Sequence, residues 1–504
     1  MKDENRSSIL PLNAKKGRGR VIEYLFYGFV FLLPWQTVFL VREIFVGGEK
    51  WQYGTVGVYF SDFILVFLLV LIVVEKLKGI LMCHFDRIRL GGEWRNLNIT
   101  KSWGYIQGEI SRLRFVLRRG EPFNCTRDDN ANGLVILFLL WMVLSIVWAD
   151  DRFLALYFSF KMFLGVGLFF AVQKIKFDFR KLIFVLLVGA VIQSGLGTWQ
   201  YLSQETFSSK WLGMSEYVAS IGGVSVLENE TGRWLRAYGG FSHPNMFGGY
   251  LALVMLVISG LNLKFKIFNL NSILNYEIFK RKKYISYGLL IVGCCLLITG
   301  LLFSFSRSAW LALAIIVIFQ FKFFNLKSIF SGEIFKQKNK KNDKVGWFVA
   351  MIVFATLIVG INHENFFSRF DGSARLEQKS VMDRVSYVTE ASQVIQDDFF
   401  VGVGAGNYTL EVMKNDRLQR PVWEYQPVHN IFLLIFSELG LVGFVLFSTM
   451  LVLLIMKTGI KALPIFVALF IFMMLDHWLW TSHYGMLFFW LILGLVYIDN
   501  KKMS

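Results

Sequence analysis

The sequence predicts an all-α, polytopic integral membrane protein with about twelve transmembrane helices. Hydrophobic residues make up 55% of the 504 residues, and the mean hydropathy is +0.51. A single soluble core of this chain length cannot bury so much apolar surface. The apolar residues also fall in repeated runs of roughly 17–25, the length that spans ~30 Å of hydrocarbon as a helix. Composition and run length together therefore favour a membrane protein over a soluble one.

Twelve apolar runs qualify as transmembrane helices by length and composition. They are approximately 21–41, 58–74, 133–149, 153–173, 182–202, 245–263, 285–304, 308–324, 346–362, 429–456, 463–480 and 484–498. Residues 1–20 are polar and basic and carry no small-residue cleavage site, so we expect a cytoplasmic tail rather than a cleaved signal peptide. Residues 499–504 form a second short tail on the same side.

Lysine and arginine counts orient these helices. With residues 1–20 inside, the predicted cytoplasmic segments and their borders hold 38 of the 53 lysines and arginines, and the outer segments hold 14. Short basic loops on one side are typical of the cytoplasmic face. The net charge of +17 then reflects an inner surface that faces anionic membrane lipids, and it requires no nucleic-acid partner.

The loops divide the chain unevenly. Residues 21–128 hold the first two spans and a basic cytoplasmic loop, in which 103–119 has the pattern of a helix lying on the membrane surface. The segments 268–283 and 324–339 are identical at ten of sixteen positions, and they are either convergent basic connectors or a short duplication. The long outer loops 203–244 and 363–428 are expected to carry binding and chemistry, and the second contains a predicted helix at 380–396.

Polar residues gather at the predicted outer ends of the spans, where ionisable groups are costly and therefore candidate functional groups. Five clusters stand out: Arg233, Arg236, His243, Pro244 and Asn245; Arg307; Arg384, Asp397, Asp398, Gly402, Gly404 and Gly406; His429 and Asn430; and Asp476, His477 and His483. A single arginine here can also snorkel to phosphate head groups, and a single histidine can be structural. Two adjacent aspartates and scattered histidines make no metal pattern, so we expect neither a metal nor a cofactor.

The clusters together suit one kind of chemistry. Arginine stays charged and presents a planar fork that matches a diphosphate. A histidine beside such arginines can take a proton from a hydroxyl, because its pKa lies near neutrality. The sequence therefore predicts a site for an anionic leaving group and a neutral nucleophile on the outer side of the membrane.

Four motifs follow one another in a specific order: RAYGGFSHPN at 236–245, SRSAWL at 306–311, DR at 383–384 with GVGAG at 402–406, and HNIFLL at 429–434 with ELGLVG at 438–443. Their order and spacing resemble the O-antigen ligase/polymerase superfamily. The resemblance covers roughly residues 130–498 and is strongest between Arg236 and Gly443. It implies a membrane catalytic domain over 129–498, with about twelve spans and a large outer loop between the ninth and tenth.

The resemblance also implies a reaction in the bacterial cytoplasmic (inner) membrane, with the site facing the periplasm or exterior. Such proteins transfer a glycan from undecaprenyl diphosphate to an acceptor hydroxyl, without a metal and with inversion. Carried over by motif, His429 is the general base, and Arg236, Arg307 and, more weakly, Arg384 hold the donor diphosphate. The supporting positions are Asn245, Asn430 and His243. This chain has His243-Pro244-Asn245 where the family often has Asn-Pro-Asn, which leaves the part played by His243 open.

The acceptor stays open, because a lipid-directed ligase, a glycan polymerase and a protein O-oligosaccharyltransferase share this donor. We expect the outer loops 203–244 and 363–428 to form the acceptor site. A flippase would carry ionisable residues near the membrane midplane, where this sequence places Lys161 alone. A metal-dependent oligosaccharyltransferase would need an acidic ligand in the first outer loop, where Glu43 and Glu49 are available. A non-catalytic scaffold would not explain the ordered motifs.

Overall fold

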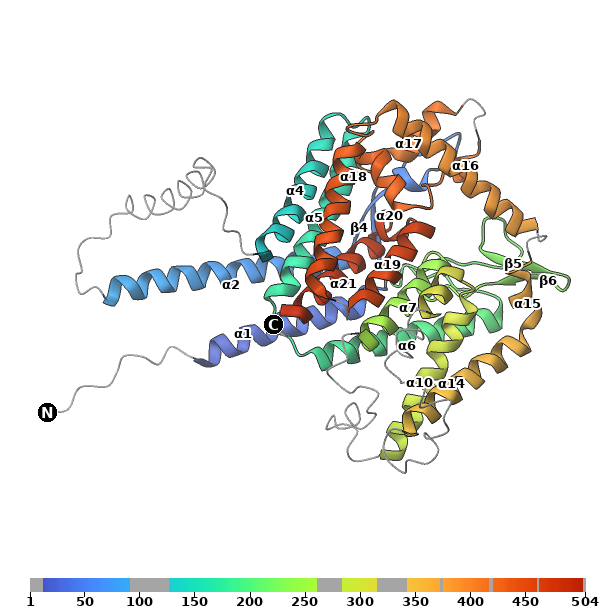
Figure 1. Ribbon diagram of the computed structural model, residues 1–504, viewed down its shortest axis with the longest axis horizontal. Helices are drawn as coiled ribbons and strands as arrows, with labels where there is room; N and C mark the ends of the chain where they lie inside the picture. The colour runs from blue at the N-terminus through green and yellow to red at the C-terminus, as the bar shows by residue number, and fades with distance from the viewer. Residues whose placement is uncertain are drawn as a thin grey trace.

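Helices dominate the computed structural model of the chain (Figure 1), which describes residues 12–90, 127–260, 283–314, 342–371, 375–416, 420–459 and 462–501. The predicted surface helix at 103–119 lies outside these ranges. So do the last residues of the expected span 308–324 and the repeat at 268–283 and 324–339, apart from Lys283. Within the described ranges, strands form three two-stranded antiparallel sheets.

The N-terminal region alternates helix and hairpin. Its elements are α1 (Leu12–Leu32), β1 (Val38–Arg42), β2 (Phe45–Val46), β3 (Glu49–Lys50), η1 (Gln52–Gly54), β4 (Val56–Tyr59) and α2 (Phe60–Leu90). Strand β1 pairs with β4, and β2 pairs with β3. The expected span 21–41 was wrong in its second half, since the helix ends at Leu32. Pro34 disfavours helix for the residue before it, and the apolar run that follows pairs as a strand.

The apolar helices pack in two neighbouring groups (Figure 1). The first group contains α4 (Arg127–Leu144), its 3-10 extension η2 (Ser145–Val147), α5 (Arg152–Lys174), α18 (Ile431–Thr458) and α21 (His483–Lys501). The second contains α6 (Phe179–Ser203), α7 (Pro244–Gly260), α10 (Lys283–Phe303) and α14 (Asn342–Ile361). Helix α19 (Leu463–Leu475) contacts α7 in one group and α18 in the other, so it joins them.

Three described helices, α5, α6 and α18, are long and apolar enough to cross a membrane. Shorter apolar helices lie at 131–147, 244–258, 291–303, 349–361, 463–475 and 483–498. Each of these segments overlaps a run that the sequence predicts as a span. The protein is therefore a mostly helical, multi-pass membrane protein.

A set of smaller elements lies beyond the ends of these helices. They are β5 (Val226–Asn229), β6 (Gly232–Leu235), α15 (His363–Ser368), α16 (Arg375–Asp397), α17 (Tyr408–Asn415) and η3 (Val422–Glu424). The predicted helix at 380–396 is confirmed as the larger part of α16. Figure 1 shows α16 running from the β5–β6 hairpin toward α17.

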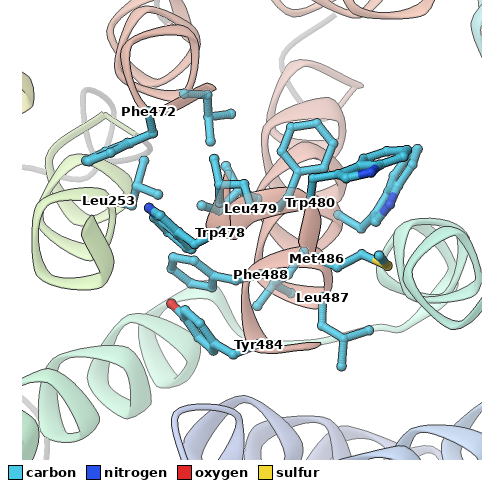
Figure 2. Close-up of a cluster of buried hydrophobic side chains, with 14 of the residues drawn as sticks. Leu253, Phe472, Trp478, Leu479, Trp480, Tyr484, Met486, Leu487 and Phe488 are labelled. Carbon is cyan, nitrogen blue, oxygen red and sulfur yellow. The ribbon is translucent and has the colours of Figure 1, made fainter. Parts of the chain in front are cut away.

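An aromatic cluster fixes the connection between α19 and α21, where the short helix α20 (Trp478–Thr481) lies (Figure 2). The ring of Trp478 lies parallel to that of Tyr484 with centroids 6.1 Å apart, and Tyr484 stacks on Phe488 at 5.2 Å. Gly249 of α7 makes room, since a Cβ there would lie 2.5 Å from Trp478. This packing holds in place the turn at residues 476–477.

Helix α18 is interrupted at Gly440, whose φ of +65° is left-handed. The glycine-rich loop docks into this interruption, with the Gly404 amide donating to the Glu438 carbonyl at 2.8 Å and the Leu441 amide donating to the Phe399 carbonyl at 2.9 Å. A Cβ on Gly440 would lie 2.3 Å from the Phe400 backbone. The GVGAG motif is thus a backbone docking loop against α18.

Replacing Gly440 with alanine should destabilise the fold, because the left-handed φ costs roughly 1–2 kcal/mol and the new Cβ also clashes with backbone. The thermal unfolding temperature of the detergent-solubilised protein would measure this loss. Gly133→Ala is the matched control, since a Cβ on that helical glycine meets nothing within 4 Å. Equal unfolding temperatures for Gly440→Ala and the wild type would contradict the docking described here.

Candidate functional site

A cavity of about 740 Å³ lies between the N-terminal hairpins, the loop before α7, α16 and the α19–α21 connection. It gathers polar side chains from segments far apart in the sequence. They are Arg236, His243, Asn245, Arg307, Arg369, Glu377, Asp383, Arg384, His429, Asp476 and His477. Six of the seven site residues that the sequence predicts line it; the seventh, Asn430, does not.

Two arginines share one carboxylate in this cavity. An Arg307 Nη lies 2.9 Å from Glu377 Oε2, and Arg369 pairs with Glu377 Oε1. Arg307 also donates to the Arg369 carbonyl at 3.3 Å, and its side chain remains 38% exposed. Burial lowers the pKa of Arg369 to about 10, so Arg369 is still charged at neutral pH. Arg307 is thus the more accessible of two adjacent guanidinium groups.

A short non-helical turn separates α10 from the helical residues 307–314, and it directs backbone carbonyls toward Arg236 and Arg369. Phe305 has a φ of +48°, a conformation that non-glycine residues seldom adopt. The Ser304 carbonyl accepts from Arg236 Nε at 2.9 Å, and the Phe305 carbonyl accepts from Arg369 at 3.1 and 3.2 Å. The turn at the short gap between the predicted spans 285–304 and 308–324 therefore orients Arg236 and Arg369, and Arg307 directly follows this turn.

Arg236 is buried, with 6% of its surface exposed. Its Nη2 donates to Asn245 Oδ1 at 2.8 Å, and Asn245 Nδ2 donates to Asp476 Oδ2 at 2.9 Å. Burial, followed by the charge of Arg369, lowers the pKa of Arg236 well below its usual value. Asn245 therefore links the guanidinium of Arg236 to the carboxylate of Asp476.

The carboxylate of Asp476 lies among histidines. Burial alone would raise its pKa, but His477, His429, His243 and the hydrogen bond from Asn245 together lower it to about 2. The backbone amide of His477 also donates to Asp476 Oδ1 at 2.8 Å. Asp476 is therefore ionised at neutral pH.

The three histidines nearest Asp476 are neutral at pH 7. Burial lowers the pKa of His243 and of His477 to about 3, and it also lowers that of His429, where the charge of Asp476 partly offsets it. The rings of His429 and His477 meet edge to face at 4.8 Å, and Tyr387 lies parallel to His429 at 5.6 Å. His429 is thus held between an aromatic ring and a second imidazole.

The remaining predicted residues have mainly local contacts. His243 Nδ1 accepts from the Asn245 amide at 3.1 Å, and its Nε2 lies 3.0 Å from Ser225 Oγ, so it closes the turn before α7. Asn430 caps α18 by accepting from the Phe432 and Leu433 amides at 3.0 and 3.1 Å. It fixes where the helix begins directly after His429.

Residues 292–448 match the family model described as O-antigen ligase. The match covers about a third of the chain, and this segment is similar to O-antigen ligases. It begins in α10 and ends in α18, so it contains Arg307, Arg384 and His429. The chain as a whole matches no curated protein. The family implies ligase or polymerase glycosyltransferase activity on lipid-linked glycans.

Sequence reasoning missed several residues that line the cavity beside the predicted site residues. In the sequence, Arg369 and Glu377 look like ordinary loop charges, and no local pattern signals that they pair. Tyr53 reaches the cavity from the segment between α1 and α2, and its ring meets that of His477 edge to face at 6.2 Å. Its separation from His477 in the sequence exceeds 400 residues, so spacing could not reveal the contact.

One trio in the cavity could hold a cation. The ligand atoms of His429, Asp476 and His477 all lie within 4.8 Å of one another. Both oxygens of Asp476 already accept hydrogen bonds, from Asn245 and from the His477 amide. A metal would therefore have to displace or share these contacts.

Removing the charge of Asp476 should lower the pKa of His429 further, because the carboxylate favours the protonated imidazole. We expect Asp476→Asn to shift the titration of His429 to lower pH, measured by NMR on protein labelled at the histidine rings. The His429 signal is assigned by its loss in His429→Gln. Asp397→Asn, outside the cavity lining, is the control. An unchanged or higher pKa of His429 in Asp476→Asn would contradict the coupling.

Proposed function

We propose that the protein is a membrane glycosyltransferase that moves a glycan from undecaprenyl diphosphate to an acceptor hydroxyl during surface polysaccharide assembly. The observation that carries this proposal is the composition of the single cavity described above. It combines a group of arginines suited to a diphosphate with a neutral histidine beside a buried carboxylate. The segment that matches the O-antigen ligase model supplies Arg307, Arg384 and His429 to it.

We further propose that about twelve helices cross the bacterial cytoplasmic membrane, with the N-terminus inside and the cavity facing the extracytoplasmic side. The excess of lysine and arginine in the predicted inner loops supports this orientation. Residues 363–428, which contain α15, α16 and α17, would then form the large outer loop between the ninth and tenth spans. Such a site receives its lipid-linked donor from the membrane.

The arginines would hold the donor diphosphate. Three carboxylates line the cavity, Glu377, Asp383 and Asp476, against five cationic side chains: Arg236, Arg307, Arg369, Lys379 and Arg384. The excess positive charge suits an anion, and the two arginines that share Glu377 are spaced to grip two oxygens. Positive groups placed where charge develops on a leaving group typically supply the largest part of catalysis.

His429 would act as the general base. The acceptor hydroxyl gives its proton to the neutral imidazole while its oxygen bonds to the anomeric carbon of the donor sugar. The bond from that carbon to the diphosphate breaks, and its electron pair leaves with the diphosphate, so the configuration inverts. Asp476 would stabilise the imidazolium that forms. This single displacement needs neither a covalent intermediate nor a metal.

The acceptor class separates the candidate functions that share this donor. We favour the O-antigen ligase type, with a glycan polymerase or a protein O-oligosaccharyltransferase as the alternatives. A flippase is disfavoured because the ionisable side chains line one cavity, and Lys161, buried within α5, pairs with Asp62 at the start of α2. That pair ties two helices together.

Replacing His429 with alanine should lower the rate of glycan transfer by roughly 10²–10⁴-fold, the usual contribution of a positioned base. Transfer is measured with membranes that contain the variant, the lipid-linked donor and acceptor extracted from the source bacterium. His363→Ala is the matched control, since His363 starts α15 and does not line the cavity. Transfer near the wild-type rate by a well-inserted His429→Ala protein would exclude His429 as the base.

Arg307→Lys should raise the KM for the lipid-linked donor by at least about tenfold, because one ammonium cannot replace a bidentate fork. Arg375→Lys provides the control, since Arg375 is an exposed arginine on the same outer region and pairs with Glu228. An unchanged donor KM in Arg307→Lys would instead assign Arg307 to the membrane surface.

EDTA should leave the transfer rate nearly unchanged, because the proposed displacement uses arginine charge in place of a metal. The measurement compares purified protein before and after chelation, with Mg²⁺ or Mn²⁺ added back. A large loss that Mg²⁺ or Mn²⁺ restores would contradict the proposal and point to the trio of His429, Asp476 and His477.

A further inference from the structure

Another part of the cavity is aromatic and uncharged. Three tyrosines and three glutamines line it: Tyr53, Tyr59, Tyr157, Gln36, Gln52 and Gln426. Four of these six residues come from the first outer loop, between α1 and α2. The hydroxyl of Tyr53 donates to Gln426 Oε1 at 2.6 Å, which ties that loop to the segment just before His429.

This part of the cavity lies beside the proposed base. A line of contacts runs from Arg236 through Asn245 and Asp476 to the backbone amide of His477, whose ring meets Tyr53. The ring of His429 contacts the same His477 ring at 4.8 Å. His477 therefore connects His429 both to the chain of contacts that leads to Arg236 and to the ring of Tyr53.

A buried ion pair, Lys161 with Asp62, packs against the tyrosines of the aromatic surface. Lys161, only 4% exposed, pairs with Asp62 and lies 4.7 Å from the ring centroid of Tyr59 and 5.3 Å from that of Tyr157. His483 stacks on Tyr59 at 3.9 Å. This packing holds the tyrosines rigidly, and the carboxylate offsets the charge of Lys161. Lys161 therefore offers an anion no unpaired charge at this surface.

One buried side-chain donor in this region lacks a hydrogen-bond partner in the described part of the chain. The Nε2 of Gln36 is buried and has no hydrogen-bond partner among the described residues. A buried donor without a partner costs roughly 1–3 kcal/mol, so it is expected to be satisfied by something that enters the cavity. A hydroxyl oxygen would accept from it.

We propose that Tyr53, Tyr157, Gln36 and Gln52 form a binding subsite for a neutral sugar ring of the acceptor. Sugar rings present C–H faces that pack on aromatic rings and hydroxyls that pair with amides, and this wall supplies both. Its place beside His429 assigns it to the sugar whose hydroxyl that histidine deprotonates. The inference rests on the proposed function and adds the chemical class of its acceptor.

With this subsite, part of acceptor recognition depends on residues outside 292–448, the segment that matches the O-antigen ligase model. The outer loop at 203–244 also reaches the cavity through Tyr217 and residues 223–226, and α16 reaches it as well. The first outer loop, however, supplies Gln36, Gln52, Tyr53 and Tyr59 to the aromatic and amide part of the lining. Acceptor choice would then depend on residues 36–59.

The test distinguishes an effect on acceptor binding from an effect on donor binding. Purified full-length protein in lipid nanodiscs is assayed with lipid-diphosphate-linked glycan from the source bacterium as donor. The acceptor is the glycan-bearing lipid fraction of a strain that lacks the protein. Tyr53→Leu removes the aromatic ring, and Tyr53→Phe keeps it. Gln36→Met removes the unsatisfied hydrogen-bond donor, the Nε2 amide of Gln36. Tyr24→Leu is the control, since Tyr24 of α1 is 60% exposed and does not line the cavity.

We expect Tyr53→Leu to raise the acceptor KM by about tenfold, as loss of one stacking contact predicts, with the donor KM and kcat little changed. Gln36→Met should raise the acceptor KM in the same way, and Tyr53→Phe should restore much of the wild-type value. A raised donor KM with an unchanged acceptor KM would overturn the assignment to the acceptor. Unchanged values for both substrates in Tyr53→Leu and Gln36→Met would overturn the subsite. If the wild type transfers no glycan, the proposed function fails on its own.

Discussion

The buried charge of Asp476 is the constraint on which the rest of the site depends. A carboxylate away from water is costly unless neighbouring groups compensate it. Asn245 from the start of α7 and the His477 amide supply hydrogen bonds, and three imidazoles surround it. Because Asn245 also accepts a hydrogen bond from Arg236, the carboxylate of Asp476 helps to fix the position of Arg236 through Asn245. One ionised group thus connects the region proposed to hold the diphosphate with the histidine proposed to accept the proton.

The cavity is built where helices are interrupted. Phe305, with its left-handed backbone, turns carbonyls toward Arg236 and Arg369. The turn after α19 presents Asp476 and His477, and it is anchored by the stacked rings of Trp478 and Tyr484 (Figure 2). In a membrane, such non-helical backbone is tolerated where protein buries it or where it lines a polar cavity. The interruptions therefore place polar groups without exposing unpaired backbone to lipid.

Much of this arrangement could be predicted from the sequence, since apolar run length marks the helices and costly polar residues mark their functional ends. Arg236, Arg307, Arg384, His243, Asn245 and His429 line one cavity, as one site requires, although their roles remain predictions. Hydropathy could not show that the first span ends at Leu32, because an apolar strand and an apolar helix look alike in composition. It also could not show the pairing of Arg369 with Glu377 or the approach of Tyr53 to His477, which depend on tertiary contacts.

The pH dependence of kcat/KM for glycan transfer tests the central claim most directly, because it reports the protonation state of the essential base in the free enzyme. A neutral His429 with a pKa lowered by burial predicts a rate that falls only on the acid side, below the ordinary histidine pKa of about 6.5. Asp476→Asn should move this acid limb to still lower pH. An acid limb above that value, or one that persists unchanged in the residual activity of His429→Gln, would contradict the account.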